Sequence, residues 1–285
     1  MPSINIAGTL HNYELTSPVA NSQAPVLVFI HGWLLSHRYW QPLIKLLQPN
    51  YQCLSYDLRG FGNSIVKDNL EDHDYTLASY GNDLAILLKE LGIKQAWLVG
   101  HSLGGSIALW SAKLSPDIVK GVVCLNAGGG IYLKEEFEKF RNAGRNLVRF
   151  RPAWLRYMPG LDAIFSRMMV ARPLALKWGR QRLQDFLCAD AQAALGSLLQ
   201  STTEEEVHLL PQLVSGLAQP VYFISGMQDK VMEPKYVHHL ASFHSLFECC
   251  GENIIEIDNC GHFAMLEHTD KVFTSISSLL VEGKP

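Results

Sequence analysis

The sequence predicts an α/β fold: a mostly parallel, twisted central sheet flanked by helices, with an inserted helical segment. Two observations support this fold class. Short apolar runs typical of buried strands alternate with longer segments at helical spacing, as in parallel sheets whose strands are joined by helices. This alternation stops between residues 131 and 204, where no strand-like run occurs.

The predicted strands are short and spread along the whole chain. They lie near residues 26–31, 51–57, 96–100, 119–125, 220–225 and 253–257. A hairpin near residues 3–15 is expected to extend one edge of the sheet. A helix is expected after the second strand, because four leucines there follow helical spacing: Leu84, Leu87, Leu88 and Leu91.

The stretch Gly100-His101-Ser102-Leu103-Gly104 follows a strand-like run and precedes a helical segment. Its pattern, G-x-S-x-G, is typical of a nucleophile elbow, a sharp strand-to-helix turn that exposes a serine hydroxyl. Glycines on either side of the serine leave space for the turn because they lack Cβ. The turn also brings the hydroxyl near a helix N-terminus, where negative charge is favoured. Ser102 is therefore the predicted nucleophile.

Two further polar residues follow strand-like runs in an informative order. Asp229 comes just after the run that ends at Phe223-Ile224, and His262 lies on a loop after residues 254–257. A serine needs a base within hydrogen-bond reach and a carboxylate that orients this base. His262 is the predicted base and acid, and Asp229 the predicted orienting carboxylate. The rival acid Asp258 lies four residues before His262 and is interpreted as the end of a strand.

Two more motifs precede the elbow: His31-Gly32-Trp33 after the first central strand, and a D-x-R-G-x-G-x-S loop at residues 57–64. With the Ser…Asp…His order, these motifs resemble the α/β-hydrolase fold superfamily over essentially the whole chain, as a serine esterase or lipase-like member with a helical cap. The resemblance implies that the backbone N–H groups of Trp33 and Leu103 form the oxyanion hole. It also implies motif-supporting roles for His31, Gly32, Gly100, His101 and Gly104.

The resemblance further implies a domain organisation. Residues 1–130 and 205–285 would form the α/β-hydrolase core, and residues 131–204 the cap, which begins after a glycine-rich, flexible stretch at residues 126–130. Between residues 131 and 190 there are twelve basic and six acidic residues, a local charge near +6 in a chain with net charge −3. The cap also carries large apolar side chains: Phe150, Trp154, Tyr157, Met158, Phe165, Met168, Met169 and Trp178.

Two interpretations of this cap are open. In one, the helices pack through their apolar faces and the arginines are solvated. In the other, a basic, apolar lid contacts an anionic or amphipathic partner: a membrane surface, an acyl carrier protein or an anionic lipid-like substrate. Methionine and aromatic side chains also suit a pocket that adapts to a long apolar chain.

Composition excludes several classes of function. The net charge of −3 does not indicate nucleic-acid binding. No apolar stretch reaches about 18 residues, so no transmembrane segment is expected, and the N-terminal residues lack the pattern of a signal peptide. The six cysteines form no C-x-x-C pair and are interpreted as reduced. We therefore expect a cytoplasmic protein, peripheral at a membrane if its cap binds one. No metal-binding motif is present, and neither a metal nor a cofactor is expected.

The serine at the elbow disfavours two classes of reaction, because haloalkane dehalogenases and epoxide hydrolases of this fold carry aspartate at that position. The resemblance implies a cofactor-free serine hydrolase that cleaves a small-molecule carboxylic ester, with a long apolar acyl or prenyl part, through an acyl-enzyme. Ester and thioester both stay open. The chain is similar to methyl esterases acting on carrier-protein-bound pimeloyl chains, to lipase-like hydrolases, and to chlorophyll dephytylases.

Two alternatives come from other classes. Lyases of menaquinone and phylloquinone synthesis use the same fold and triad to eliminate pyruvate, but they carry an arginine directly after S-x-G-G. This chain has Ser106 there, although arginines of the cap could bind the carboxylate instead. A catalytically inactive binding protein, like hormone receptors of this fold, is the third class, and the intact triad weighs against it.

Overall fold

The computed structural model describes residues 2–19, 24–64, 66, 74–129, 134–248 and 251–282. Across these ranges the chain forms an eight-stranded sheet with the order β1-β2-β4-β3-β5-β6-β7-β8. The predicted edge hairpin is present: β1 (Ser3–Ile6) pairs with β2 (Thr9–Leu15) in antiparallel register. β2 also runs antiparallel to β4, and the other neighbouring strands pair in parallel. The predicted fold class is confirmed.

Each predicted central strand occurs within a few residues of its expected position. These strands are β3 (Val26–Ile30), β4 (Cys53–Tyr56), β5 (Ala96–His101), β6 (Val119–Leu125), β7 (Val221–Gly226) and β8 (Ile254–Ile257). The helices that join and follow them are α1 (Gln41–Leu47), α2 (Leu77–Glu90), α3 (Leu103–Leu114), α8 (Glu204–Ser215), α9 (Pro234–Ala241), α10 (Ala264–Glu267) and α11 (Thr269–Glu282). Two short 3₁₀ turns also occur in this part: η1 (His37–Trp40), with four residues, and η3 (Ser245–Phe247), with three.

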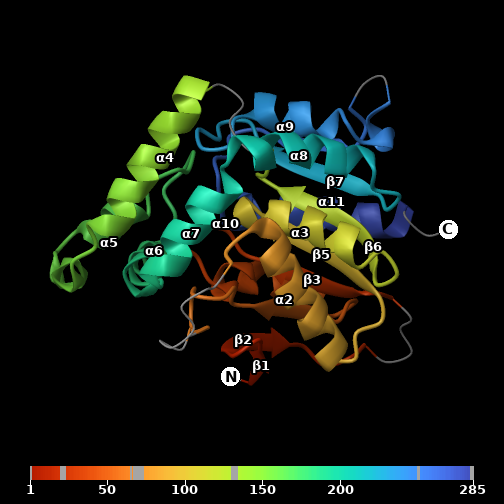
Figure 1. The fold of residues 1–285 in the computed structure, drawn as a ribbon, viewed down its shortest axis with the longest axis horizontal. Coiled ribbons are helices and arrows are strands. Elements are labelled where there is room, and N and C mark those ends of the chain that lie inside the picture. Colours follow the sequence, from red (N-terminus) through yellow and green to blue (C-terminus); the bar gives the residue numbers. More distant parts are fainter. Residues whose placement is uncertain are drawn as a thin grey trace.

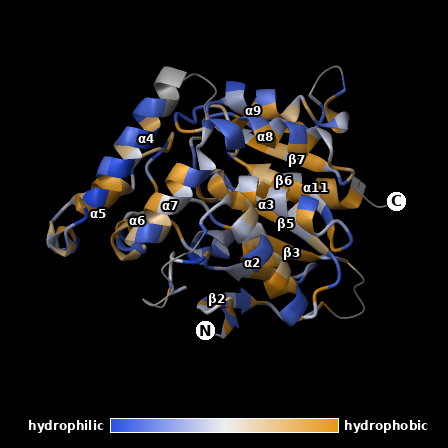
Figure 2. Ribbon diagram, in the orientation of Figure 1, coloured by the Kyte–Doolittle hydropathy of each residue, from blue (hydrophilic) through white to orange (hydrophobic). Residues whose placement is uncertain are grey.

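The central strands are buried on both faces, which explains their nearly continuous apolar sequences (Figure 2). Alternate side chains of β3 enter opposite layers, with Val28 and Ile30 on one face of the sheet and Leu27 and Phe29 on the other. Helices α2, α3, α8 and α9 cover the first face. Helices α1 and α11 cover the second.

The segment between β6 and β7 is helical wherever the structure describes it. It contains α4 (Lys134–Arg149), the 3₁₀ turn η2 (Ala153–Tyr157), α5 (Leu161–Phe165), α6 (Leu176–Cys188) and α7 (Ala191–Ser201). We refer to these elements as the inserted helices. In Figure 1 they project to one side of the sheet, with α4 and α5 outermost. The domain limits given above stay a prediction.

Specific hydrogen bonds hold the inserted helices against the loops that follow the strands. The indole Nε1–H of Trp33 donates to the carbonyl of Ala194 at 2.8 Å. The backbone N–H of His262 donates to the carbonyl of Met169, also at 2.8 Å. Because both donors belong to motif loops, the position of the inserted helices is coupled directly to these loops.

Most of the basic residues between β6 and β7 that the structure describes fall into two groups. Arg141 donates to carbonyls of Leu199 and Thr202, where α7 ends. Arg151 donates to the carbonyl of Phe186 at 2.8 Å, near the end of α6. These arginines satisfy carbonyls that a helix end leaves without partners. Others are exposed: Lys139, Arg149, Arg156, Arg167, Arg172, Lys177 and Arg180. None of the helices in the described ranges is long and apolar enough to span a membrane.

Candidate active site

Ser102 lies between β5 and α3 with φ of +52° and ψ of −121°. This left-handed conformation is rare for a residue with a side chain and is typical of strained turns at functional sites. The neighbouring glycines permit the turn. A Cβ on Gly100 would lie 2.2 Å from the carbonyl oxygen of Gly104, and a Cβ on Gly104 would lie 2.3 Å from that of Ile30. Any larger side chain at either position would push the turn apart.

His262 and Asp229 form a buried pair. The Nδ1–H of His262 donates to Asp229 Oδ2 at 2.7 Å. The other carboxylate oxygen, Oδ1, accepts the backbone N–H groups of Val231 at 2.8 Å and Met232 at 3.0 Å. Burial by itself would raise the pKa of Asp229, but His262 and the two backbone donors outweigh it and hold this pKa below its usual value. The carboxylate is therefore ionised at neutral pH, and it leaves Nε2 of His262 as the free acceptor.

Asn126 is a member of this cluster that the sequence analysis did not identify. The residue directly follows β6, is fully buried, and has a φ of +49°. Its side-chain amide donates to Asp229 Oδ2 at 2.9 Å and to the carbonyl of Gly261 at 3.1 Å. The stretch was predicted to be flexible, yet Asn126 and Ala127 are packed in the interior. Asn126 follows a strand, as Asp229 and His262 do. This position could have identified it as a candidate site residue from the sequence.

His31 and His101 make buried hydrogen bonds to the backbone of the loops that follow the strands. His31 accepts the N–H of Leu58 through Nε2 at 2.9 Å, and its Nδ1–H donates to the carbonyl of Gly32 at 2.8 Å. The Nε2–H of His101 donates to the carbonyl of His262 at 2.7 Å. A Cβ on Gly32 would lie 2.8 Å from Nδ1 of His101, which explains glycine at this position. Both imidazoles are neutral in these arrangements.

Buried neutral histidines make the fold sensitive to acid. Burial lowers the pKa of His11 and His31 to about 4 and that of His101 to about 3, from 6.5 in the unfolded chain. Below pH 6.5 the unfolded chain therefore binds protons that the folded chain does not, which favours unfolding. Asp83 and Asp185 act in the opposite direction, because burial raises each pKa to about 6. As the pH falls below 6, the folded chain protonates these carboxylates first.

On acidification the three histidines destabilise the fold more than the two carboxylates stabilise it. We expect the free energy of unfolding to fall by roughly 3 kcal/mol between pH 7 and pH 5. Urea unfolding followed by circular dichroism at the two pH values would measure this difference. A free energy of unfolding that is equal or higher at pH 5 would contradict the assignment of neutral buried histidines.

A cavity of about 200 Å³ opens at the carboxyl ends of the strands. Ser102 and His262 both line it, together with Trp33 and Leu103. No hydrogen bond between described residues takes up the backbone N–H of Trp33 or Leu103. Within the same ranges, no group of three or more histidine, cysteine, aspartate or glutamate side chains is arranged to hold a metal ion. The cavity is thus lined by a serine, an imidazole and two residues whose backbone N–H groups have no hydrogen-bond partner among the described residues.

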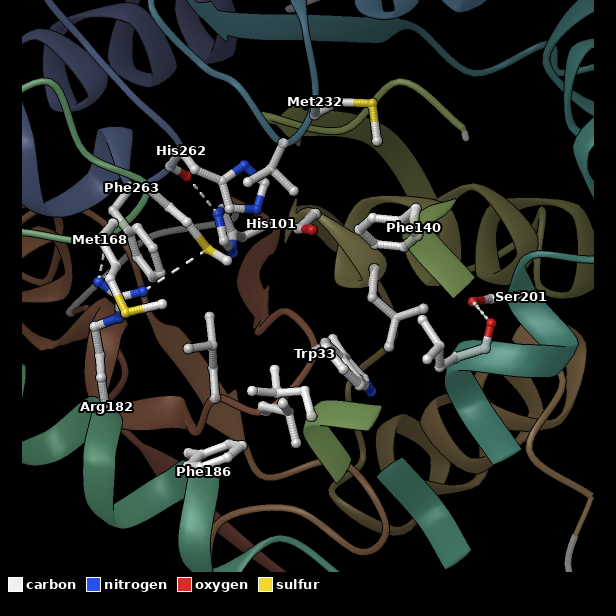
Figure 3. A pocket seen from close by; sticks show the side chains of 18 of the residues that line it. Trp33, His101, Phe140, Met168, Arg182, Phe186, Ser201, Met232, His262 and Phe263 are labelled. Atoms are coloured by element: carbon white, nitrogen blue, oxygen red, sulfur yellow. Dashed lines mark hydrogen bonds between the residues drawn. The ribbon is translucent and has the colours of Figure 1, made fainter. Parts of the chain in front are cut away.

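The rest of the wall is mostly apolar and comes in part from the inserted helices (Figure 3). Among the apolar residues singled out in the sequence of this segment, Phe165, Met168 and Met169 line the cavity. Phe150, Trp154, Tyr157 and Met158 are exposed instead, and Trp178 stacks on Tyr39 at 5.7 Å between ring centroids. Four more apolar lining residues come from the inserted helices and were not predicted from the sequence: Phe140, Leu147, Phe186 and Leu198.

Comparisons with known proteins agree with this architecture. The chain matches the α/β hydrolase fold family over residues 25–269. It is 41% identical over 110 residues to the "Putative carbamate hydrolase RutD" of Enterobacter cloacae, which is 39% of this chain and 40% of that protein. This match thus spans about two fifths of the relative's length. The "Bifunctional esterase/perhydrolase DCH" of Acinetobacter calcoaceticus is 27% identical over 221 residues, covering 73% of this chain and 76% of that one.

Solved structures show the same fold at lower sequence identity. A thermophilic esterase from Thermogutta terrifontis, determined with malate bound, aligns with a TM-score of 0.77 at 20% identity and covers 100% of both chains. An esterase from Exiguobacterium antarcticum aligns with the same TM-score at 18% identity, over 96% of this chain and 97% of that one. At these identities the likeness concerns the fold alone.

Proposed function

Because the chain belongs to the α/β hydrolase fold family, we propose that it is a serine hydrolase that cleaves a carboxylic ester through an acyl-enzyme. One observation carries the proposal: Ser102, at a strained strand-to-helix turn, and His262, paired with Asp229 at 2.7 Å, line one cavity. The esterase named among the relatives, 27% identical over most of both chains, supports this class of reaction.

In the proposed mechanism Ser102 Oγ attacks the ester carbonyl while its proton passes to Nε2 of His262. Asp229 holds the imidazole in the required tautomer and stabilises the imidazolium that forms. The imidazolium then donates its proton to the departing alkoxide, which leaves as the alcohol and yields the acyl-enzyme. His262 next removes a proton from water, the resulting hydroxide attacks the acyl group, and the carboxylic acid is released with Ser102 restored.

The oxyanion of each tetrahedral intermediate needs donors that are already in place. We assign this role to the backbone N–H groups of Trp33 and Leu103. Neither group donates a hydrogen bond to a described residue. Leu103 is the first residue of α3, where the helix dipole also favours negative charge. A single donor of this kind is typically worth about 3 kcal/mol of transition-state stabilisation. We assign His31, Gly32, Gly100, His101 and Gly104 to positioning these groups.

The apolar wall of the cavity favours an ester with a sizeable apolar part. The direct test is hydrolysis of p-nitrophenyl esters of increasing acyl length. We expect turnover with an optimum at intermediate length, because the cavity has a volume of only about 200 Å³ and limits the acyl chain that fits. Absence of turnover at every length, in folded protein, would contradict the esterase proposal and favour the lyase alternative.

We also propose that the inserted helices contact an anionic lipid surface. Phe150, Trp154 and Tyr157 are 73%, 56% and 79% exposed. Exposed basic residues, Arg149 and Arg156, lie beside them in the chain. Aromatic and basic side chains together are typical of segments that lie in the interface of an anionic membrane.

This surface predicts salt-sensitive binding to vesicles that contain acidic phospholipid. Sedimentation with such vesicles should be strong at low salt and should weaken several-fold at physiological salt. Replacing Trp154 and Tyr157 by alanine should reduce binding at both salt concentrations. The matched control is Val281→Ala, which removes an equally exposed apolar group from α11, away from the inserted helices (Figure 1). Absence of vesicle binding at low salt would contradict the proposal.

A further inference from the structure

Arg182 is a charged residue in the wall of an otherwise apolar cavity. It lies on α6, is only 6% exposed, and lines the same cavity as Ser102 and His262. In Figure 3 its side chain reaches the side of the cavity where His262 and Phe263 lie, opposite Phe140 and Ser201. Its guanidinium lies over the ring of Phe263 with 4.3 Å between Cζ and the ring centroid. A full positive charge is therefore held over the residue that follows the proposed catalytic base in the chain.

Among the described residues, the hydrogen-bond partners of Arg182 are neutral groups. One terminal nitrogen, Nη1, donates to the carbonyls of Phe165 and Met168, the latter at 2.7 Å. The other, Nη2, has the sulfur of Met169 at 3.8 Å, which is a weak acceptor. Among the described residues no carboxylate lies within ion-pair distance of Arg182. By contrast, the buried Arg59 pairs with Asp83 at 3.2 Å.

The charge of this buried group persists at neutral pH. Burial lowers the pKa of Arg182 to about 10, although Tyr39 and Glu267 act to raise it. Glu267 does not approach as a partner, because its carboxylate accepts backbone N–H groups of Gly261 and Ala171. A buried cation without an ionised partner is costly, and an anion placed beside it recovers much of that cost.

We propose that Arg182 binds a carboxylate on the substrate, so that the site selects esters carrying a second, anionic end. The guanidinium presents planar donors that match a carboxylate, and Nη2 retains donor capacity toward it. The apolar side chains that line the same cavity would contact a short hydrocarbon spacer. This inference rests on the proposed ester hydrolysis, and it adds to it a substrate class: half-esters of dicarboxylic acids, or esters of similar shape.

A purely structural role for Arg182 makes a different prediction. If it only fixes the turn that contains Phe165 and Met168, its loss would change the hydrolysis of charged and neutral esters to the same extent. The informative quantity is therefore the ratio of kcat/KM for an anionic ester to that for a neutral ester of equal chain length. Monomethyl adipate and methyl hexanoate form such a pair, because only the terminal group differs.

We expect this ratio to fall roughly 10- to 100-fold in Arg182→Met, as for the loss of a charge-assisted hydrogen bond. The matched control is Arg180→Met on the same helix. The side chain of Arg180 is 69% exposed and pairs with Asp162, so this variant loses the same charge without touching the cavity. Its ratio should equal that of the wild type. An unchanged ratio in Arg182→Met would overturn the proposal.

Two further measurements separate this proposal from that of ester hydrolysis. If Arg182→Met fails to fold, Arg182→Lys keeps the charge but loses the planar donors, and its ratio should still fall. In the Ser102→Ala background, adipate should raise the Tm, and addition of Arg182→Met should abolish this shift. This second measurement does not depend on catalysis. Failure of the wild type to cleave either ester would contradict the proposed function, whereas cleavage of both without dependence on Arg182 would contradict only this inference.

Discussion

Ser102→Ala is expected to lower kcat for ester hydrolysis by roughly 10⁴- to 10⁶-fold, the usual effect of removing the nucleophile of a serine hydrolase. The side chain is not needed for folding, because it makes no capping hydrogen bond to α3. Alanine can occupy the same backbone conformation, so the Tm should change little. Hydrolysis of a p-nitrophenyl ester and thermal unfolding of the same preparation would measure both quantities.

Ser111, a serine in α3, provides the control. Ser111 is buried in α3, away from the cavity wall, and its hydroxyl donates to the carbonyl of Ile107 at 2.8 Å. Ser111→Ala makes the same chemical change and should leave kcat near that of the wild type. If Ser102→Ala kept substantial activity while folded, the nucleophile would have to be sought elsewhere in the cavity.

Much of the arrangement around Ser102 was predictable because each motif directly follows a parallel strand. Trp33 comes after β3, Ser102 after β5, Asp229 after β7 and His262 after β8. The carboxyl ends of parallel strands meet at one edge of the sheet, which is where such folds form their sites. Once the strands were assigned, the motifs had to lie near one another, and the structure brings them together. Their catalytic roles stay predictions.

The wall of the cavity was not predictable in the same way. The sequence of the inserted helices contains apolar residues throughout, but only the docked arrangement decides which face inward. Phe165 and Met168 enter the cavity, whereas the equally apolar Trp154 and Tyr157 are exposed. That choice depends on tertiary contacts such as the Trp33–Ala194 hydrogen bond, which leave no periodic signal in the sequence.

Charge composition was similarly ambiguous. The count of twelve basic residues suggested either a solvated surface or an anionic partner. It could not show that Arg141 and Arg151 satisfy helix-end carbonyls, or that Arg182 is buried in the cavity. The acceptors of these arginines are backbone carbonyls. Their positions depend on where each helix ends and not on residue type.

Asp229→Asn is expected to lower kcat by roughly 10³- to 10⁴-fold, because the substitution forces the wrong tautomer on His262. Asparagine has only one acceptor oxygen, and two backbone N–H groups, those of Val231 and Met232, already point at the position of Oδ1. The amide oxygen will occupy that position, since the reverse orientation would set the NH₂ group against both of these donors. The new NH₂ group then faces Nδ1 of His262, which must become the acceptor.

With Nδ1 as acceptor, the proton of His262 moves to Nε2, and this nitrogen can no longer take the proton of Ser102. Steady-state kinetics on one ester would measure the loss, and circular dichroism would check the fold. Asp258→Asn is the matched control: Asp258 is exposed, lies four residues before His262, and is the rival acid from the sequence. Near-normal kcat in Asp229→Asn with a large loss in Asp258→Asn would reverse the assignment. A large loss in Asp229→Asn alone would identify the 2.7 Å contact as the one that orients the base.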